Sequence, residues 1–349
     1  MATEWVELED IPVQSEHEVN GLMSGELFWR NHQLWLQECG LDPVLVNGSE
    51  TFLCEDAIPL FATQLVDAIR VEDGAFVVLK LISKSVHPEE AEIFEYFSTP
   101  ELVIRGFSAC SPLLNALSPP DDEDKLIFVM KLMRKYDSPR FNTFGEVVKF
   151  FRQMFEGMQF MHHHRVAHRD GNSNNIMMDG KHLFPPASTL NISAMNGVPR
   201  KGCSSSERPN TITGPSDLLN IILLTSAYPV SSGQEKTLEH TQSWPFMGGD
   251  RSPREFGVLG KLDPFATDIY YLGNLIRREF LDVSRISALA VAPKLGFEFM
   301  RPLVSDMVQS DPAKRPTIDE VVSRFQEIHS RLSWWKLRSR VVKKTEVTA

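Results

Sequence analysis

The chain has 349 residues, of which 42% are hydrophobic and 23% are charged, as in an ordinary globular protein. Its formal charge is −10, because 36 basic residues stand against 46 acidic ones. This balance disfavours a nucleic-acid partner, since binding to a phosphate backbone requires a basic surface. No stretch approaches the roughly 20 apolar residues that span a bilayer, so we expect no transmembrane segment.

The start of the chain and its cysteines both favour an intracellular protein, cytoplasmic or nuclear. The first ten residues, MATEWVELED, are acidic and contain no apolar run, which argues against a secretory signal. The cysteines are scattered and form no Cys-x-x-Cys pair, so they predict neither a zinc site nor a disulfide framework. They are Cys39, Cys54, Cys110 and Cys203.

The first part of the chain is predicted to be rich in strands. Residues 1–20 are polar and are expected to form a loose terminal segment. Residues 25–40 have the apolar spacing of an amphipathic helix that stops at Gly40. Residues 65–82 predict two strands, joined by a tight turn at Asp73-Gly74.

A short helix and a further strand complete this part. Residues 87–97 carry Pro88 at the start and acidic residues in the first turn, which is typical of a helix N-terminus. Residues 124–133 are apolar and partly β-branched, and they predict a strand.

Helical periodicity replaces the strand pattern from about residue 143. It is interrupted at about 181–250, where Ser, Pro, Gly and Asn are frequent, and it returns in 268–281 and 318–332. Strands followed by helices predict an α+β chain of two lobes. We place a small β-rich lobe with a leading helix at 21–133, a helical lobe at 134–330, a hinge near 131–140 and a basic tail at 331–349.

The residues 166–180, VAHRDGNSNNIMMDG, have the letters and spacing of a phosphotransfer loop. His168-Arg169-Asp170 is followed by Asn175 five residues after the aspartate. Such a loop needs an aspartate to accept the hydroxyl proton or orient the nucleophile, and an asparagine to hold a metal ion. The motif follows a predicted helix and precedes an apolar run suited to a short strand, which is the context that the motif requires.

With these residues the chain resembles eukaryotic protein kinases, and specifically the divergent protein-kinase-like family of mushroom-forming fungi, over about residues 20–330. The resemblance implies a bilobal protein-kinase-like fold and ATP-dependent phosphorylation of Ser or Thr on a protein, with ATP and Mg²⁺ as cofactors. It implies that Asp170 is the catalytic base or orienting group, with His168 and Arg169 beside it, and that Asn175 is a metal ligand.

Two stretches of the first lobe extend the resemblance to the nucleotide site. VVLK (77–80) is similar to the kinase motif Val-Ala-Ile-Lys, which implies that Lys80 grips the α- and β-phosphates. A buried lysine needs an acidic partner, and Glu90 on the following helix is favoured over Glu92. FVMK (128–131) implies that Met130 lines the adenine site and that the backbone near Met133 contacts the base, although plain core packing explains these residues equally well.

Two stretches of the second lobe are similar to structural segments of kinases. DIYYLG (268–273) implies that Asp268 anchors the backbone of the catalytic loop. DPAKRPT (311–317) implies that Arg315 pairs with Glu255, although Arg254 interrupts the usual Pro-Glu neighbourhood. This pair is expected to be structural, because a buried ion pair is weak support for catalysis.

Three departures from the kinase pattern weaken the prediction of catalysis. No Gly-x-Gly precedes Lys80, and glycines there would let backbone amides approach the phosphates. Asn172 stands where kinases carry a lysine, and no Asp-Phe-Gly occurs between Asn175 and Glu255. A pseudokinase that binds or scaffolds is therefore the alternative; a small-molecule kinase is a third, disfavoured by DIYYLG and DPAKRPT.

A change of reading frame could explain the missing Asp-Phe-Gly. Residues 220–229, NIILLTSAYP, can be encoded so that a shift of two bases reads Tyr-His-Phe-Thr-Asp-Phe-Gly-Leu-Ser. We hypothesise that part of 181–245 is translated out of frame, by a frameshift or a mis-assigned splice site. Residues read in the wrong frame were never selected to pack, which would explain the lack of periodicity.

Two further signals receive structural interpretations. His162, His163 and His164 are consecutive, so on a helix they point in different directions and are not expected to share one metal ion. The basic tail SWWKLRSRVVKK, with Trp334 and Trp335, is expected to be a docked or frayed terminal segment; contact with an anionic membrane or a partner is the alternative.

Overall fold

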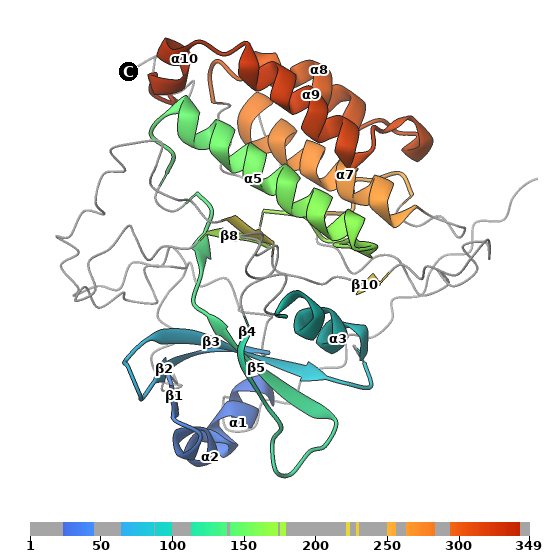
Figure 1. Ribbon diagram of the computed structural model, residues 1–349. Coiled ribbons are helices and arrows are strands. Elements are labelled where there is room, and N and C mark those ends of the chain that lie inside the picture. The colour runs from blue at the N-terminus through green and yellow to red at the C-terminus, as the bar shows by residue number, and fades with distance from the viewer. Residues whose placement is uncertain are drawn as a thin grey trace, which may run out of the picture. The chain divides into compact units, whose positions relative to one another are not determined.

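The computed structural model describes residues 24–44, 64–86, 88–99, 113–137, 140–173, 175–178, 221–223, 228–229, 250–255, 263–282 and 294–342. It is an α+β protein with a five-stranded antiparallel sheet and a group of helices, as the sequence predicts (Figure 1). The chain divides into two compact units. The first contains Met1–Ile82 and Asn115–Met130, and the second contains Ser83–Leu114 and Lys131–Ala349.

The first unit is built on the five-stranded sheet, with strand order β1-β2-β3-β5-β4. Its strands are β1 (Leu41–Pro43), β2 (Leu65–Arg70), β3 (Phe76–Ser83), β4 (Leu113–Leu117) and β5 (Lys125–Lys131). The predicted turn joins β2 to β3, and Gly74 adopts a φ of +68°, which favours glycine. Asp73 stabilises the turn, because its carboxylate accepts hydrogen bonds from Arg70 and from the backbone of Ala75.

Two short helices, α1 (Ser24–Asn31) and α2 (Gln33–Glu38), replace the single helix predicted over 25–40. The interruption is at His32, whose buried ring bonds to the Phe28 carbonyl and to Asp121. The predicted stop at Gly40 is confirmed, since this residue has a φ of +81°. Apolar side chains of both helices and of the sheet form one core: Trp29, Leu36, Leu41, Ala68, Val77, Leu79, Ile127 and Val129.

Helix α3 (Pro88–Phe97) begins at the predicted proline but belongs to the second unit, whereas the sequence analysis had placed it in the first lobe. Its last turn explains the grouping. The ring of Phe97 lies 5.6 Å from that of Phe160, and the Tyr96 hydroxyl lies 2.6 Å from Nδ1 of His164. Ile93 and Phe97 are also part of the main core of the second unit.

The second unit is organised around α5 (Phe144–His163). Thr143 caps its N-terminus by accepting a hydrogen bond from the Glu146 amide, and the Glu146 carboxylate accepts one from the Asn142 amide. Around α5 lie α7 (Pro264–Ile276) with its π-helical continuation η2 (Arg277–Leu281), α8 (Arg301–Met307), α9 (Ile318–Ser330) and α10 (Trp334–Arg338), together with the short turns η3 (Glu298–Met300) and η4 (Pro312–Lys314) (Figure 1). Between them lies a core rich in phenylalanine: Phe150, Phe151, Phe155, Phe280, Phe297 and Phe325.

Short strands carry the loop that contains the phosphotransfer motif. The predicted strand after Asn175 is β8 (Ile176–Met178), and it lies between β6 (Arg134–Lys135) and β9 (Ile221–Leu223). Before the motif, β7 (Val166–Ala167) pairs with β10 (Tyr228–Pro229). The range 181–250, predicted to be irregular, therefore contains two short strands, and most of its other residues lie outside the described part of the chain.

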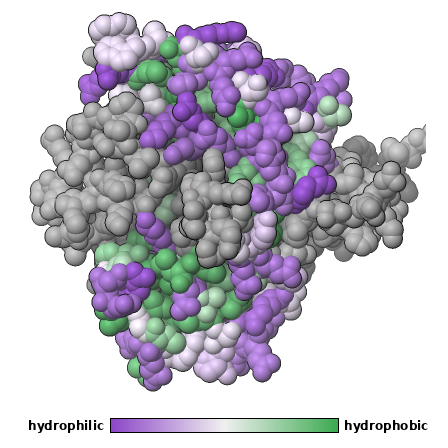
Figure 2. All heavy atoms as spheres, in the orientation of Figure 1, coloured by the Kyte–Doolittle hydropathy of each residue, from purple (hydrophilic) through white to green (hydrophobic). Residues whose placement is uncertain are grey.

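Over the described residues, none of the helices combines the length and the apolar character that crossing a bilayer requires. On the face drawn in Figure 2, hydrophilic side chains cover most of the helical unit, and hydrophobic side chains gather over the sheet of the first unit. Cys39 is an exposed thiol; the other three cysteines lie outside the described residues.

Candidate functional site

The candidate site is the loop between β7 and β8, which follows directly on the end of α5. Helix α5 ends at His163, and Arg165 has a φ of +60°, which reverses the chain after the helix. The loop itself is folded by hydrogen bonds between its own backbone groups: the Asn172 amide donates to the Asp170 carbonyl at 2.8 Å, and the Asn175 amide donates to the Asn172 carbonyl at 3.1 Å.

Asp268 holds the start of this loop. It lies in the first turns of α7, which Asp263 caps, and its side chain is completely buried. One carboxylate oxygen accepts the His168 amide at 2.8 Å, and the other accepts the Arg169 amide at 2.6 Å. His162 Nε2 also lies 3.0 Å from this carboxylate. The backbone anchoring that the resemblance implied for Asp268 is therefore present.

Arg169 has a strained backbone, with a φ of +62°. A non-glycine residue in this region costs of order 1–3 kcal/mol and persists only where its surroundings fix it. The Asp268 carboxylate supplies that restraint, because it binds the amide of the strained residue and the amide before it. The strain is thus located directly before Asp170, the residue that the motif assigns to catalysis.

The Asp170 carboxylate is oriented by two amides of its own loop. Asn175 Nδ2 donates to one carboxylate oxygen at 2.6 Å and to the Asp170 carbonyl at 2.9 Å. Asn172 Nδ2 donates to the other carboxylate oxygen. The Asp170 amide in turn donates to Nδ1 of the buried His168, so that nitrogen carries no proton. The motif residues therefore form one connected polar group.

Apolar side chains and a neutral tyrosine pack against this loop. Gly171 is buried, and a Cβ placed there would touch Tyr271, Leu272 and Met158 at 3.6–3.7 Å. Burial raises the pKa of Tyr271 well above its usual value, and the negative charge of Asp170 raises it further. Tyr271 thus remains a neutral phenol beside the loop.

The loop contains oxygen atoms that could ligate a magnesium ion. Asn175 directs its amide nitrogen at Asp170, so its carbonyl oxygen is the atom that could ligate a cation, and Mg²⁺ prefers carboxylate, carbonyl and phosphate oxygens. Over the described residues, no group of three or more His, Cys, Asp and Glu side chains could enclose an ion. The residues present therefore fit one side of a site that nucleotide phosphates would have to complete.

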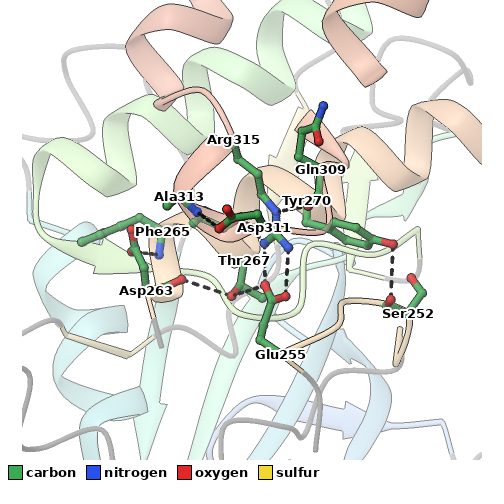
Figure 3. A network of polar contacts seen from close by, with 11 residues as sticks. Ser252, Glu255, Asp263, Phe265, Thr267, Tyr270, Gln309, Asp311, Ala313 and Arg315 are labelled. Carbon is green, nitrogen blue, oxygen red and sulfur yellow. Dashed lines mark hydrogen bonds and ion pairs between the residues drawn. The ribbon is translucent and has the colours of Figure 1, made fainter. Parts of the chain in front are cut away.

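A second polar group fixes the segment 250–255 (Figure 3). Arg315 Nη1 and Nη2 bind the two carboxylate oxygens of Glu255 at 2.5 and 2.9 Å, and both side chains are almost fully buried. Burial opposes the charge of Glu255, but the hydrogen bonds from Arg315 prevail and lower its pKa. The ion pair expected from DPAKRPT is present.

The Arg315 guanidinium has further partners beyond Glu255. Nε donates to the Gln309 carbonyl at 2.8 Å, Nη1 donates to the Ala266 carbonyl at 3.0 Å, and the group lies over the ring of Tyr270, 4.8 Å from its centroid. Additional hydrogen bonds to a buried cation help to offset the free-energy cost of removing the ion pair from water. The pair therefore ties the 250–255 segment to α7 and η4.

The contacts at the start of this segment were not predicted from the sequence. Asn274, buried in α7, donates to Asp250 and to the Ser252 hydroxyl, and Arg277 donates to the Asn274 carbonyl. The Tyr270 hydroxyl donates to the Ser252 carbonyl at 3.3 Å (Figure 3). An asparagine on the apolar face of DIYYLGNLI was the one available signal.

The three consecutive histidines bind three different elements. His162 contacts Asp268, His163 lies 2.9 Å from Asp319, and His164 contacts the Tyr96 hydroxyl. The three side chains diverge, as expected for consecutive residues at the end of a helix. They connect the end of α5 to α7, α9 and α3.

The remaining predicted residues are divided between the units. Lys80 is half-buried on β3 and Met130 is buried on β5, both in the first unit. Glu90 is half-buried on α3, and Met133 is buried after β5, both in the second unit. The convergence of Lys80 on Glu90 and on the loop stays a prediction, as do the adenine contacts of the two methionines.

Comparison with known proteins gives no family: no protein-family model matches the chain, and no curated protein matches it.

Proposed function

We propose that the chain is a protein-kinase-like protein with a bilobal kinase fold, whose chemistry is ATP-dependent phosphoryl transfer to a Ser or Thr hydroxyl of a protein. The observation that carries the proposal is the loop 168–175: Asp268 binds two consecutive amides before Asp170, and Asn175 binds its carboxylate. The buried Glu255–Arg315 pair supports it independently, because the resemblance implied that pair from separate residues.

In the proposed reaction Asp170 accepts the proton of the substrate hydroxyl as the hydroxyl oxygen bonds to the γ-phosphorus of ATP. The bond from that phosphorus to the β,γ-bridging oxygen breaks, and ADP leaves. Asn175 and Asn172 hold the Asp170 carboxylate in place before the substrate arrives, so little reorganisation is needed. When bound, Mg²⁺ supplies charge neutralisation on the phosphates.

A pseudokinase is the second candidate, and the contacts of Asn172 favour it. In place of a lysine that would face the transferred phosphate, Asn172 turns its amide to the Asp170 carboxylate. The chain also lacks a glycine-rich loop before Lys80 and an Asp-Phe-Gly. Loss of one charge-stabilising group commonly costs 10²–10³ in rate, about 3–4 kcal/mol.

The strand β9 bears on the reading-frame hypothesis. Leu223, its last residue, pairs with Ile176, the residue after Asn175. In the hypothesised shifted frame the Asp-Phe-Gly codons would begin at the last base of codon 224, one codon after this strand. An aspartate encoded at that point would come soon after β9. Strand β9 pairs with β8, and β8 begins directly after Asn175. Sequencing the transcript over codons 176–250 decides the hypothesis: codons at 220–229 that spell Asp-Phe-Gly in no frame would exclude it.

The test is transfer of labelled γ-phosphate to a general protein substrate, by the chain and by its Asp170→Asn variant. We expect Asp170→Asn to lower the rate by about 10²–10⁴-fold, the usual contribution of a positioned base. Asp42→Asn is the matched control, since Asp42 is exposed in the first unit, and it should leave the rate unchanged.

The outcomes separate the two candidates. Transfer that Asp170→Asn leaves intact refutes the assigned base. No transfer and no thermal shift with Mg-ATP, in this chain and in one that reads Asp-Phe-Gly, favours the pseudokinase. If only the chain that reads Asp-Phe-Gly transfers phosphate, then the present translated form is inert and the proposed chemistry holds.

A further inference from the structure

The tail of the second unit presents an unusual surface. Of the large hydrophobic side chains in the described residues, Trp335 is among the most exposed, at 77%, and its neighbour Trp334 is 54% exposed. Both are on α10, and their rings meet edge to face with centroids 4.6 Å apart. Indole rings are large and apolar, so leaving two of them exposed to water forgoes the favourable free energy of burying them. Exposed apolar patches of this kind mark interaction sites.

This exposure does not come from a frayed end. Ser333 caps α10, the Phe144 amide donates to the Ser339 carbonyl, and the Val341 amide donates to the Asn142 carbonyl. Leu337 packs against the core of the second unit, and its backbone approaches Gly145 so closely that a Cβ there would lie 3.0 Å from the Leu337 carbonyl oxygen. The tail is docked through its backbone and Leu337, and docking leaves the indoles outward.

Basic residues are concentrated in the part of the sequence that carries the two indoles. Residues 331–344 contain six basic residues and no acidic one, so the rest of the chain carries a formal charge of −16. The Arg338 guanidinium lies 3.9 Å from the centroid of the Trp334 ring, and Arg338 and Arg340 are exposed. Lys336 does not join them: its ammonium lies over the Phe144 ring, and burial lowers its pKa.

We propose that α10 and Arg340 form a docking surface for an anionic lipid membrane. Tryptophan prefers the interface between lipid and water, where its ring meets apolar chains and its N–H stays hydrated. Exposed arginines beside it are attracted to anionic headgroups. A five-residue helix buries little apolar area, so binding requires both contributions and is reversible.

A soluble acidic partner is less favoured by the geometry. Protein hot spots place aromatic residues in the centre of a patch, sheltered from water by neighbouring side chains. Here α10 lies at the end of the helical unit, beside the first turn of α5 (Figure 1). Both of its indoles are exposed, and Arg338 lies against the Trp334 ring. Exposed rings with charge beside them suit insertion into a surface rather than burial in a pocket.

The test is flotation of the full chain with vesicles of phosphatidylcholine alone or mixed with phosphatidylserine. We expect binding to the mixed vesicles only, weakened by salt. Arg338→Gln with Arg340→Gln should lower the partition coefficient about 25-fold, at roughly fivefold for each basic residue. Trp334→Ser with Trp335→Ser should abolish binding. The matched controls are Leu34→Ser, at a leucine that is 76% exposed, and Lys314→Gln, at an exposed lysine. Neither control should change vesicle binding.

A second measurement does not depend on the variants folding. Brominated acyl chains in the mixed vesicles should quench the tryptophan fluorescence of the unmodified chain. Absence of binding to mixed vesicles, equal binding to pure phosphatidylcholine, or no quenching would overturn the proposal. So would binding to poly-glutamate without binding to vesicles, which would assign the surface to an acidic protein.

Discussion

At the scale of single residues, Asp268 decides the conformation of the candidate loop. It is the only residue of DIYYLG that we assigned a role, and its buried carboxylate binds the two amides before Asp170 and the ring of His162. An aspartate early in a helix is common, so its letters alone did not distinguish an anchor from an ordinary cap. Its burial and its partners make that distinction.

Asp268→Asn should therefore destabilise the fold. The Asp268 carboxylate contacts three groups, which are the His168 amide, the Arg169 amide and His162 Nε2. Asparagine has one acceptor oxygen in place of two, and its NH₂ group would point a donor at one of the amides or at the ring. We expect the free energy of unfolding to fall by about 3 kcal/mol, as for lost hydrogen bonds to a buried charge. Urea denaturation of the purified chain measures this change.

Asp263→Asn is the control, since it alters the cap of the same helix and asparagine caps as well as aspartate. It should change the free energy of unfolding by only a few tenths of a kcal/mol. Equal effects of the two variants would mean that Asp268 is no more than another residue of the α7 N-terminus.

The sequence predicted part of the site at this scale, and the limits are physical. Asp170 and Asn175 were named from motif spacing, and Asp268, Glu255 and Arg315 from the kinase resemblance, because both can be read without tertiary information. The contacts of Asn274 with Asp250, and of Asn172 with Asp170, were not found. The first contact depends on how two separate segments approach, and the second on how the loop folds back on itself; spacing along the chain encodes neither.

At the scale of elements, the local signals were sufficient wherever a cap or a turn was encoded. Pro88 begins α3, Gly74 closes the β2–β3 turn and Gly40 ends α2. The helix predicted over 25–40 is broken because His32 is held by Asp121, a residue far along the chain. Helix α3 joined the second unit because Tyr96 and Phe97 pack on α5, which its own amphipathic pattern could not reveal.

The Glu255–Arg315 pair gives a prediction at this scale, because it ties the segment 250–255 to α7 and η4. Glu255→Gln leaves the buried guanidinium without its counter-charge. We expect the free energy of unfolding at neutral pH to fall by about 3 kcal/mol, as when one partner of a buried pair is removed.

The effect should depend on pH in a defined direction. The folded pKa of Glu255 is lowered, so its contribution is fully present above the unfolded pKa of about 4.3 and is lost as pH falls through the lower folded value. The difference between the wild type and Glu255→Gln should therefore shrink below about pH 4.

Glu298→Gln provides the comparison. Glu298 also pairs with an arginine, Arg301, but both are exposed, and such pairs contribute about 0–1 kcal/mol. Denaturant titrations at several pH values would contradict the account if the Glu255→Gln deficit stayed constant from pH 7 to pH 3.

At the scale of the whole molecule, the chain consists of two units with separate cores. The order of strands and helices predicted the α+β class, because each element is specified locally by its own periodicity. The assignment of elements to units depended on long-range packing, and it differs from the prediction at Ser83–Leu114. The proposed function requires a relation of the same kind, because the kinase resemblance implies that Lys80 of the first unit and Asp170 of the second act together.

The most direct test of that claim is labelling by an acyl-phosphate derivative of ATP, which transfers its acyl group to a lysine beside bound phosphates. Mass spectrometry would compare Lys80 with Lys84, an exposed lysine just after the same strand. The account predicts that Lys80 is labelled selectively and that Mg-ATP protects it, in this chain or in the chain that reads Asp-Phe-Gly. Labelling of Lys80 no greater than that of Lys84, or unaffected by Mg-ATP, in both chains would contradict it.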